Sequence, residues 1–175
     1  MFQVPFQIRR AVADDADSLS AFARSVFSLG GRPGATHADL EAYFSAKLTP
    51  AHFRTSIANA HHLLLVAEVE REIAGYGEIV RDVPAPQIAE PRPSELRKLY
   101  VGPRYHGLGI ADALMRDLLR DAAHPVWLSV FSENPRAIRF YERWGFKIIG
   151  THDFLVGDDP QQDFVMRRDE SKGTA

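Results

Sequence analysis

One short stretch of the sequence decides the fold, and it reads Leu99-Tyr100-Val101-Gly102-Pro103-Arg104-Tyr105-His106-Gly107-Leu108-Gly109. Residues 95–101 have the length and apolar content of a strand. Residues 107–123 carry apolar side chains at helical spacing, namely Ile110, Leu114, Leu118 and Ala122. The stretch therefore predicts a strand that passes through a tight turn into a helix.

The turn has the features of an anion site. A helix N-terminus offers unpaired N–H groups and a partial positive charge of about half a unit. Gly107 and Gly109 would let the backbone approach an anion closely, and Arg104 would add a fixed charge. A tight turn without a ligand explains the glycines equally well. The spacing fits neither the dinucleotide Gly-x-Gly-x-x-Gly pattern nor the nucleoside-triphosphate loop, since no Gly-Lys-Ser/Thr follows.

A second group of residues follows the predicted strand 126–131. Asn134-Pro135 opens a helix that Gly145 closes, and the helix carries Phe140, Tyr141 and Trp144. Taken alone, such an aromatic stripe is most often core. Together, the turn and this helix place an anion site and a phenol on one side of a sheet.

The rest of the chain predicts a mixed α/β sandwich. Its elements follow in the order β-α-α-α-β-β-β-α-β-α-β-β. We expect one domain over 1–168 and a disordered tail over 169–175. The other predicted segments are a strand at 6–10, helices over 13–29, 36–48 and from 49, hairpin strands 63–69 and 73–81, a proline-rich loop 82–94, and strands 146–154 and 164–166.

Composition excludes several classes of function. The chain has 175 residues, no cysteine and a formal net charge of -2, so disulfides and thiolate chemistry are absent and no charge favours nucleic acid or membrane binding. No signal peptide or membrane-spanning run is recognisable, which predicts a cytoplasmic protein. No histidine pair has the spacing of a metal site, so we expect no metal.

Two motifs resemble those of the GNAT superfamily of N-acetyltransferases. Leu99-Tyr100-Val101 with Arg104-x-x-Gly107-x-Gly109 resembles its cofactor motif, and Asn134, Ala137, Phe140-Tyr141 and Gly145-Phe146 resemble its second motif. The ends of the chain resemble the PaiA-like polyamine acetyltransferases, through residues 39–43, 150–154 and 157–166.

The resemblance implies a three-layer fold with a central mixed sheet, flanked by helices, whose two parallel central strands, 95–101 and 126–131, splay apart around the pantetheine arm of acetyl-CoA. It implies a bulge near Leu99-Tyr100-Val101, an oxyanion donor in the Val101 N–H, and Tyr141 as the acid that protonates the sulfur. The cofactor-binding residues it implies are Leu99, Tyr100, Val101, Arg104, His106, Gly107, Leu108, Gly109, Ile110, Ala111, Asn134, Phe140 and Arg143.

Two carboxylates are candidates for the general base. Glu95 lies where many relatives carry an acid that works through water, and Glu78 on the neighbouring strand is a rival. Either could instead be a surface carboxylate facing Arg81, Arg97 or Lys98.

The acceptor expected from the resemblance is a small-molecule amine, with spermidine and spermine as the first choice. The N-terminal helices and the loop 82–94 would form its roof. A protein or peptide acetyltransferase is the alternative within the same chemistry, and it predicts an open groove. A third hypothesis is a regulatory protein that senses acetyl-CoA without turnover, although Tyr141 favours an enzyme. The chain is expected to be a monomer or a homodimer.

Overall fold

The computed structural model describes residues 5–30, 36–85, 87–89, 92–122, 125–156 and 159–169. Most of the expected C-terminal tail, residues 170–175, lies outside these ranges. The elements follow the predicted order. They are β1 (Gln7–Arg10), α1 (Ala16–Val26), α2 (His37–Lys47), α3 (Pro50–Ala58), β2 (His62–Val69), β3 (Glu72–Val80), β4 (Ser94–Val101), α4 (Ile110–Arg120), β5 (Val126–Phe131), α5 (Pro135–Arg143), β6 (Lys147–Val156) and β7 (Asp159–Arg168).

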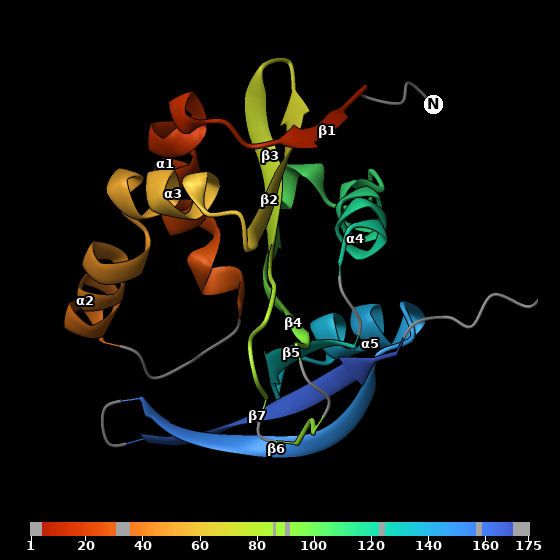
Figure 1. Ribbon diagram of the computed structural model, residues 1–175. Helices are drawn as coiled ribbons and strands as arrows, with labels where there is room; N and C mark the ends of the chain where they lie inside the picture. The colour runs from red at the N-terminus through yellow and green to blue at the C-terminus, as the bar shows by residue number, and fades with distance from the viewer. Residues whose placement is uncertain are drawn as a thin grey trace, which may run out of the picture.

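Seven strands form one sheet in the order β1-β2-β3-β4-β5-β7-β6. Only β4 and β5 run parallel, and every other neighbouring pair is antiparallel. Helices α1 and α3 cover one face of β2 to β4, and α4 covers the other (Figure 1). The predicted three-layer arrangement with a mixed central sheet is confirmed.

Each face of the sheet has its own core. Leu114, Met115 and Leu118 of α4 are buried against strand residues on one face. Leu19 of α1 and Phe53 of α3 are buried on the other. Helix α2 buries no residue and lies at the outer side of α1 and α3 (Figure 1), so its place depends on a few edge contacts.

The parallel strands β4 and β5 pair over only two rungs, Ser94 with Val126 and Glu95 with Trp127. Beyond these rungs β4 continues to pair with β3 as far as Val101. Strand β5 stays with β7 over its whole length. The two central strands therefore separate, as the resemblance implied.

A bulge in β4 turns the strand at the start of this separation. Leu96 pairs with Ile79 and Lys98 pairs with Glu78, so Arg97 has no partner in β3. The bulge lies two residues before the position that the resemblance implied. As a result Leu96 packs with the α4-side core, whereas Tyr100 packs with the α1 and α3 side.

Two other predictions need correction in detail. Helix α4 begins at Ile110 and not at 107, because Gly107 and Gly109 have positive φ and cannot belong to the helix. Strand β7 is longer than the predicted 164–166, because it pairs with both β5 and β6.

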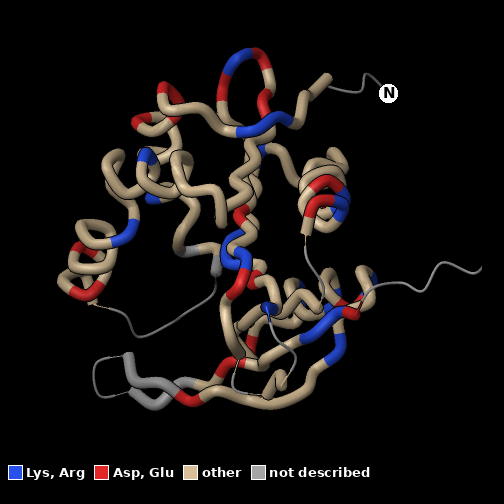
Figure 2. The backbone as a smooth tube through the Cα atoms, viewed as in Figure 1, with Lys and Arg blue, Asp and Glu red and all other residues tan. Residues whose placement is uncertain are grey.

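Charges of both signs are interspersed along the helices and strands, as Figure 2 shows. Within the described ranges no helix is long and apolar enough to cross a membrane.

Candidate functional site

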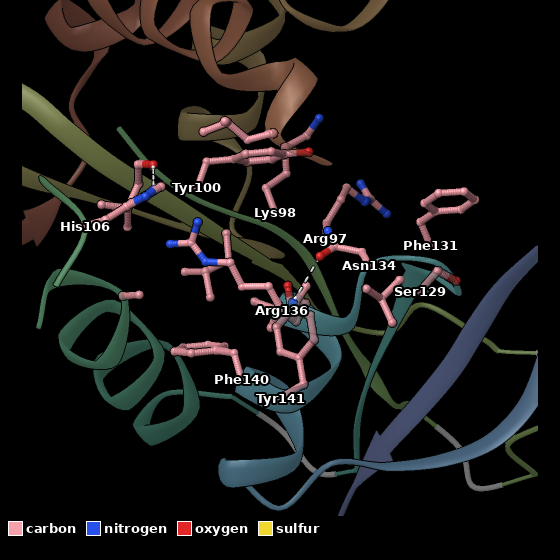
Figure 3. Close-up of a pocket in the computed structure, with 17 residues that line it drawn as sticks. Arg97, Lys98, Tyr100, His106, Ser129, Phe131, Asn134, Arg136, Phe140 and Tyr141 are labelled. Carbon is pink, nitrogen blue, oxygen red and sulfur yellow. Dashed lines mark hydrogen bonds between the residues drawn. The ribbon is translucent and has the colours of Figure 1, made fainter. Parts of the chain in front are cut away.

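A pocket of about 260 Å³ occupies the opening between β4 and β5. Tyr100 and Lys98 of β4 stand on one side of it, and Phe140 and Tyr141 of α5 stand on the opposite side (Figure 3). The sequence predicted eight of its lining residues: Leu99, Tyr100, Val101, His106, Ala111, Asn134, Phe140 and Tyr141.

Backbone groups of both central strands face this opening. Gly102 N–H donates to Ala74 across β3 and β4, and Ser132 N–H donates to Gln162 across β5 and β7, at 2.9 and 3.0 Å. Antiparallel ladders alternate between bonded and non-bonded pairs. By this alternation the N–H groups of Leu99 and Val101 point away from β3 and into the splay. An extended ligand can therefore pair with β4 like an additional strand.

The glycine turn closes one end of the pocket. Gly107 and Gly109 have φ of 81° and 80°, and nothing lies within 4 Å of the position that a Cβ would take at either residue. Gly109 is also the N-cap of α4. Both glycines are exposed, so an anion can approach the turn that precedes the first-turn N–H groups of α4.

Two basic residues of the turn have other contacts. His106 Nε2 lies 2.9 Å from the Val101 carbonyl oxygen, which can only accept, so the ring fixes the end of β4. Arg104 donates to Glu72 at the β2–β3 hairpin and lies over the ring of Tyr105. Arg104 is therefore directed away from the pocket in this structure.

Tyr141 is placed by the start of α5. The Asn134 side chain caps this helix by accepting from Ala137 N–H at 3.1 Å, and Pro135 occupies the first turn. The Tyr141 ring packs edge-on against Phe140 and Phe146. Burial raises the pKa of Tyr141 well above its usual range, so the phenol stays protonated and can only donate a proton at neutral pH.

Arg143 does not reach the pocket. Its guanidinium lies over the ring of Phe140 and 4.0 Å from Asp112 in the first turn of α4. Asp112 also accepts from the Trp144 indole at 3.0 Å. These contacts hold α5 against α4.

The two candidate bases differ in their surroundings. Glu95 accepts from Arg97 Nε at 2.8 Å and from the Arg97 terminal nitrogen at 2.5 Å. Glu78 is 3% exposed and accepts from His62 Nδ1 at 2.8 Å. Burial pushes the pKa of Glu78 up, but the hydrogen bond and charge of His62 outweigh it and leave the pKa below its usual value. Neither carboxylate lines the pocket directly.

Sequence reasoning missed the cations of the pocket wall. Arg97, Lys98 and Arg136 line it, and no carboxylate does so among the described residues. The orientation of Arg97 and Lys98 depends on the bulge in β4. The alternation of apolar and polar residues in the sequence does not reveal this bulge. Arg136 lies in the first turn of α5, beside the predicted site residue Asn134. This position was the sequence signal that could have identified Arg136 as a pocket residue.

Comparison with known proteins gives the family. Residues 34–146 match the acetyltransferase (GNAT) family model. An uncharacterised N-acetyltransferase of Mycobacterium tuberculosis is 37% identical over 159 residues, which cover 89% of this chain and 97% of the relative. The N-alpha-acetyltransferase RimI of the same species is 31% identical over 121 residues, 69% of this chain and 74% of RimI. The spermine/spermidine N(1)-acetyltransferase of Bacillus subtilis is 33% identical over 64 residues, 34% of this chain and 42% of that enzyme.

A solved structure supports the same fold. The PaiA N-acetyltransferase from Thermoplasma acidophilum, in complex with coenzyme A, matches with a TM-score of 0.74 at 21% identity, over 95% of this chain and 99% of that one. The described part of this chain holds no cluster of three His, Asp or Glu side chains that suits a metal ion. The splayed strands, the uncovered glycine turn and the family match agree, and this chain belongs to the GNAT acetyltransferase family as an N-acetyltransferase that uses acetyl-CoA.

Proposed function

We propose that this enzyme transfers the acetyl group of acetyl-CoA to the primary amine of a small molecule, by direct attack within a ternary complex. The observation that carries the proposal is the position of Tyr141, a protonated phenol on α5 that lies across one pocket from β4, whose Leu99 and Val101 N–H groups point into the splay. A protein that only senses the cofactor would have no need of a proton donor at this point.

The residues around the pocket fit acetyl-CoA, which supplies the acetyl thioester. Leu99 would pair with the pantetheine arm through its backbone, Val101 would face the acetyl group, and the turn from Gly107 to Ala111 would hold the diphosphate through its N–H groups. Asn134 and Phe140 would border the arm from α5. We add Arg136 to the predicted set, since it lines the same pocket.

The transfer needs two donors from the chain. The Val101 N–H would donate to the acetyl oxygen as the amine nitrogen bonds to the carbonyl carbon. The Tyr141 hydroxyl would give its proton to the sulfur as the carbon–sulfur bond breaks. Arg104 and Arg143 would contribute to phosphate binding only after leaving Glu72 and Asp112.

We propose a polyamine as the acceptor, as the resemblance of the chain ends predicted. The short match to the Bacillus subtilis spermine/spermidine enzyme supports it. The N-terminus of a peptide is the second candidate, because the match to RimI covers about twice as much of the chain.

An assay of free thiol release tests the proposal. Acetyl-CoA would be combined with spermidine, spermine, free amino acids, aminoglycosides and peptides with a free N-terminus, for the wild type and Tyr141→Phe. Polyamine-dependent release that is lost in the variant supports the full proposal. Release with peptides alone would select the second candidate. Acetyl-CoA binding without release for any acceptor would contradict an enzyme for small amines.

A further inference from the structure

Two positively charged side chains line the inner part of the pocket, where β4 and β5 begin to separate. Arg97 on β4 and Ser129 on β5 each lie two residues beyond the last paired rung of the two strands. Both line the pocket together with Lys98, and Figure 3 shows Arg97 and Ser129 at the end opposite to His106. This inner end therefore presents two cations and a hydroxyl, each of which can donate hydrogen bonds.

The phosphates of acetyl-CoA do not account for these two cations. The diphosphate is proposed to lie at the glycine turn, which follows Val101 at the other end of β4. At the usual rise per residue, the strand from Arg97 to Val101 spans about 13 Å. Tyr141, the proposed proton donor to the sulfur, stands between His106 and Ser129 in the view of Figure 3. The inner cations thus lie beyond the reacting groups as seen from the phosphates.

The carboxylates near these cations do not line the pocket. Arg97 gives two of its N–H groups to Glu95, at 2.8 and 2.5 Å, and this pairing fixes the direction of the guanidinium while its other donors remain. Lys98 donates to the uncharged hydroxyl of Tyr43 at 3.1 Å, and the carboxylate opposite it on β3, Glu78, is 3% exposed. Because Coulomb interactions weaken with distance, a charged group inside the pocket interacts more strongly with the two cations than with the carboxylates behind them.

We infer that this inner end is a subsite for a carboxylate that one of the two substrates carries. The planar guanidinium of Arg97 matches the two oxygens of a carboxylate, and the ammonium of Lys98 adds a compact charge. The hydroxyl of Ser129 supplies a further donor from the opposite strand. The inference rests on the proposed function, because it concerns the substrates of the same transfer.

The carboxylate can come from either substrate. An amino acid or a peptide brings one on the acceptor. A polyamine has none, so with that acceptor the acyl chain of the donor would supply it, as in succinyl-CoA. The same bonds change in both cases. The amine loses a proton to solvent and bonds to the carbonyl carbon, the carbon–sulfur bond breaks, and the sulfur takes the proton of Tyr141.

Pairs of substrates that are matched except for the carboxylate test the inference. The acceptor arm uses acetyl-CoA and compares free amino acids and short peptides with their carboxamides. The donor arm uses the amine that the wild type accepts and compares succinyl-CoA with butyryl-CoA, whose chain is equally long but uncharged. In at least one arm kcat/KM should favour the carboxylate about 10- to 100-fold, the usual effect of a hydrogen bond to a charged group. The arm that shows the preference identifies the substrate that carries the carboxylate.

Two variants connect this preference to the subsite. Arg97→Gln and Lys98→Gln should each move the ratio of kcat/KM for the charged and the uncharged substrate toward equality. A merely structural defect would lower both values together and leave the ratio unchanged. Arg54→Gln is the control and should keep the wild-type ratio, because Arg54 pairs with Asp17 at the surface and does not line the pocket. If thermal melting shows that one variant is unstable, the other still decides the test.

Equal kcat/KM for the charged and the uncharged substrate in both arms of the wild type would overturn the inference and leave the acetyl transfer intact. A preference for the carboxylate that survives in both variants would also overturn it, since another group would then bind the carboxylate. Absence of thiol release with every pair of substrates would instead overturn the proposed function and this inference with it.

Discussion

Tyr141 is the single residue whose side chain is expected to act on the reacting sulfur. Replacing Tyr141 with Phe removes the hydroxyl but keeps the ring contacts with Phe140 and Phe146. We therefore expect kcat to fall about 10²–10⁴-fold, the usual contribution of a general acid, while the affinity for acetyl-CoA changes little. Steady-state turnover and calorimetric titration with acetyl-CoA would measure the two quantities. Equal turnover in the variant would remove Tyr141 from the mechanism.

The raised pKa of Tyr141 also predicts the alkaline side of the wild-type profile. A phenol must lose its proton before it stops acting as an acid, and burial moves that loss above the ordinary value of about 10. The wild-type kcat should therefore show no descending limb below about pH 10. A fall that centres near pH 8 would assign the proton donor to another group.

Gly109 gives a prediction about the turn. Its φ of 80° strains any residue with a Cβ, by roughly 1–2 kcal/mol, although the space around it is open. Gly109→Ala should lower both stability and affinity for acetyl-CoA. Gly109→Asn is the informative companion, because Asn tolerates this conformation but places a side chain where the diphosphate would lie. Thermal melting should show the smaller loss for Asn, and titration should show weak binding for both.

Individual site residues differ in how far the sequence could predict them. Tyr141 and the glycines of the turn could be predicted because each lies within a few residues, along the sequence, of the start of a helix or within it. Arg97 and Lys98 were missed as pocket residues, because the bulge at Arg97 reverses the faces that simple alternation assigns. The partner of Arg104, Glu72, lies in a different hairpin, and no local pattern links the two.

Among the elements, α2 is the one most loosely attached. Tyr43 of α2 packs on Phe27 with ring centroids 4.6 Å apart, and its hydroxyl accepts from Lys98 at 3.1 Å. The helix buries no residue, so these contacts, together with the packing of Phe44 on Phe27, place it beside the pocket residue Lys98. Tyr43→Ala should raise KM for the acceptor several-fold and leave KM for acetyl-CoA unchanged. Tyr43→Phe keeps the ring contact and serves as the control, and an unchanged acceptor KM in both would exclude α2 from the acceptor site.

The elements themselves were largely predictable, because their apolar periodicity and caps are local. The box of Thr36 with Asp39 at α2 and the Thr49-Pro50 start of α3 are both present. The lengths were less predictable. The extent of β7 depends on two neighbouring strands, and its sequence alone did not show them.

At the scale of the whole molecule, the sheet has its shortest strand pairing between β4 and β5, and we call this junction the seam. Two rungs join the strands, and the proposed site of acetyl-CoA spans the seam. A ligand that binds only the folded state at 100 times its Kd adds about 2.7 kcal/mol of stability. For a chain of this size we expect a rise in Tm of roughly 5–10 °C. Differential scanning fluorimetry with acetyl-CoA would measure it, and an unchanged Tm at saturation would contradict binding at the seam.

The class of fold followed from the sequence because the predicted order of strands and helices is compatible with few sheet arrangements. The separation of β4 and β5 was implied by the family resemblance. The location of the pocket wall and the pairing of Glu78 with His62 did not follow. The pocket wall depends on the bulge at Arg97, and the pair joins residues 16 apart in sequence that meet only when the β2–β3 hairpin forms.

The seam also coincides with a single point along the chain. Strands β1 to β4 and helices α1 to α4 come from residues before Asp121, whereas β5 to β7 and α5 come from residues after Pro125. Cutting the gene between these positions would yield two polypeptides that contact each other mainly through the two paired positions of β4 and β5 and through a shared apolar core. Their reassembly should depend on acetyl-CoA, which would bind across the junction. The two fragments, each fused to half of a luminescent reporter, would therefore form a sensor of acetyl-CoA in living cells.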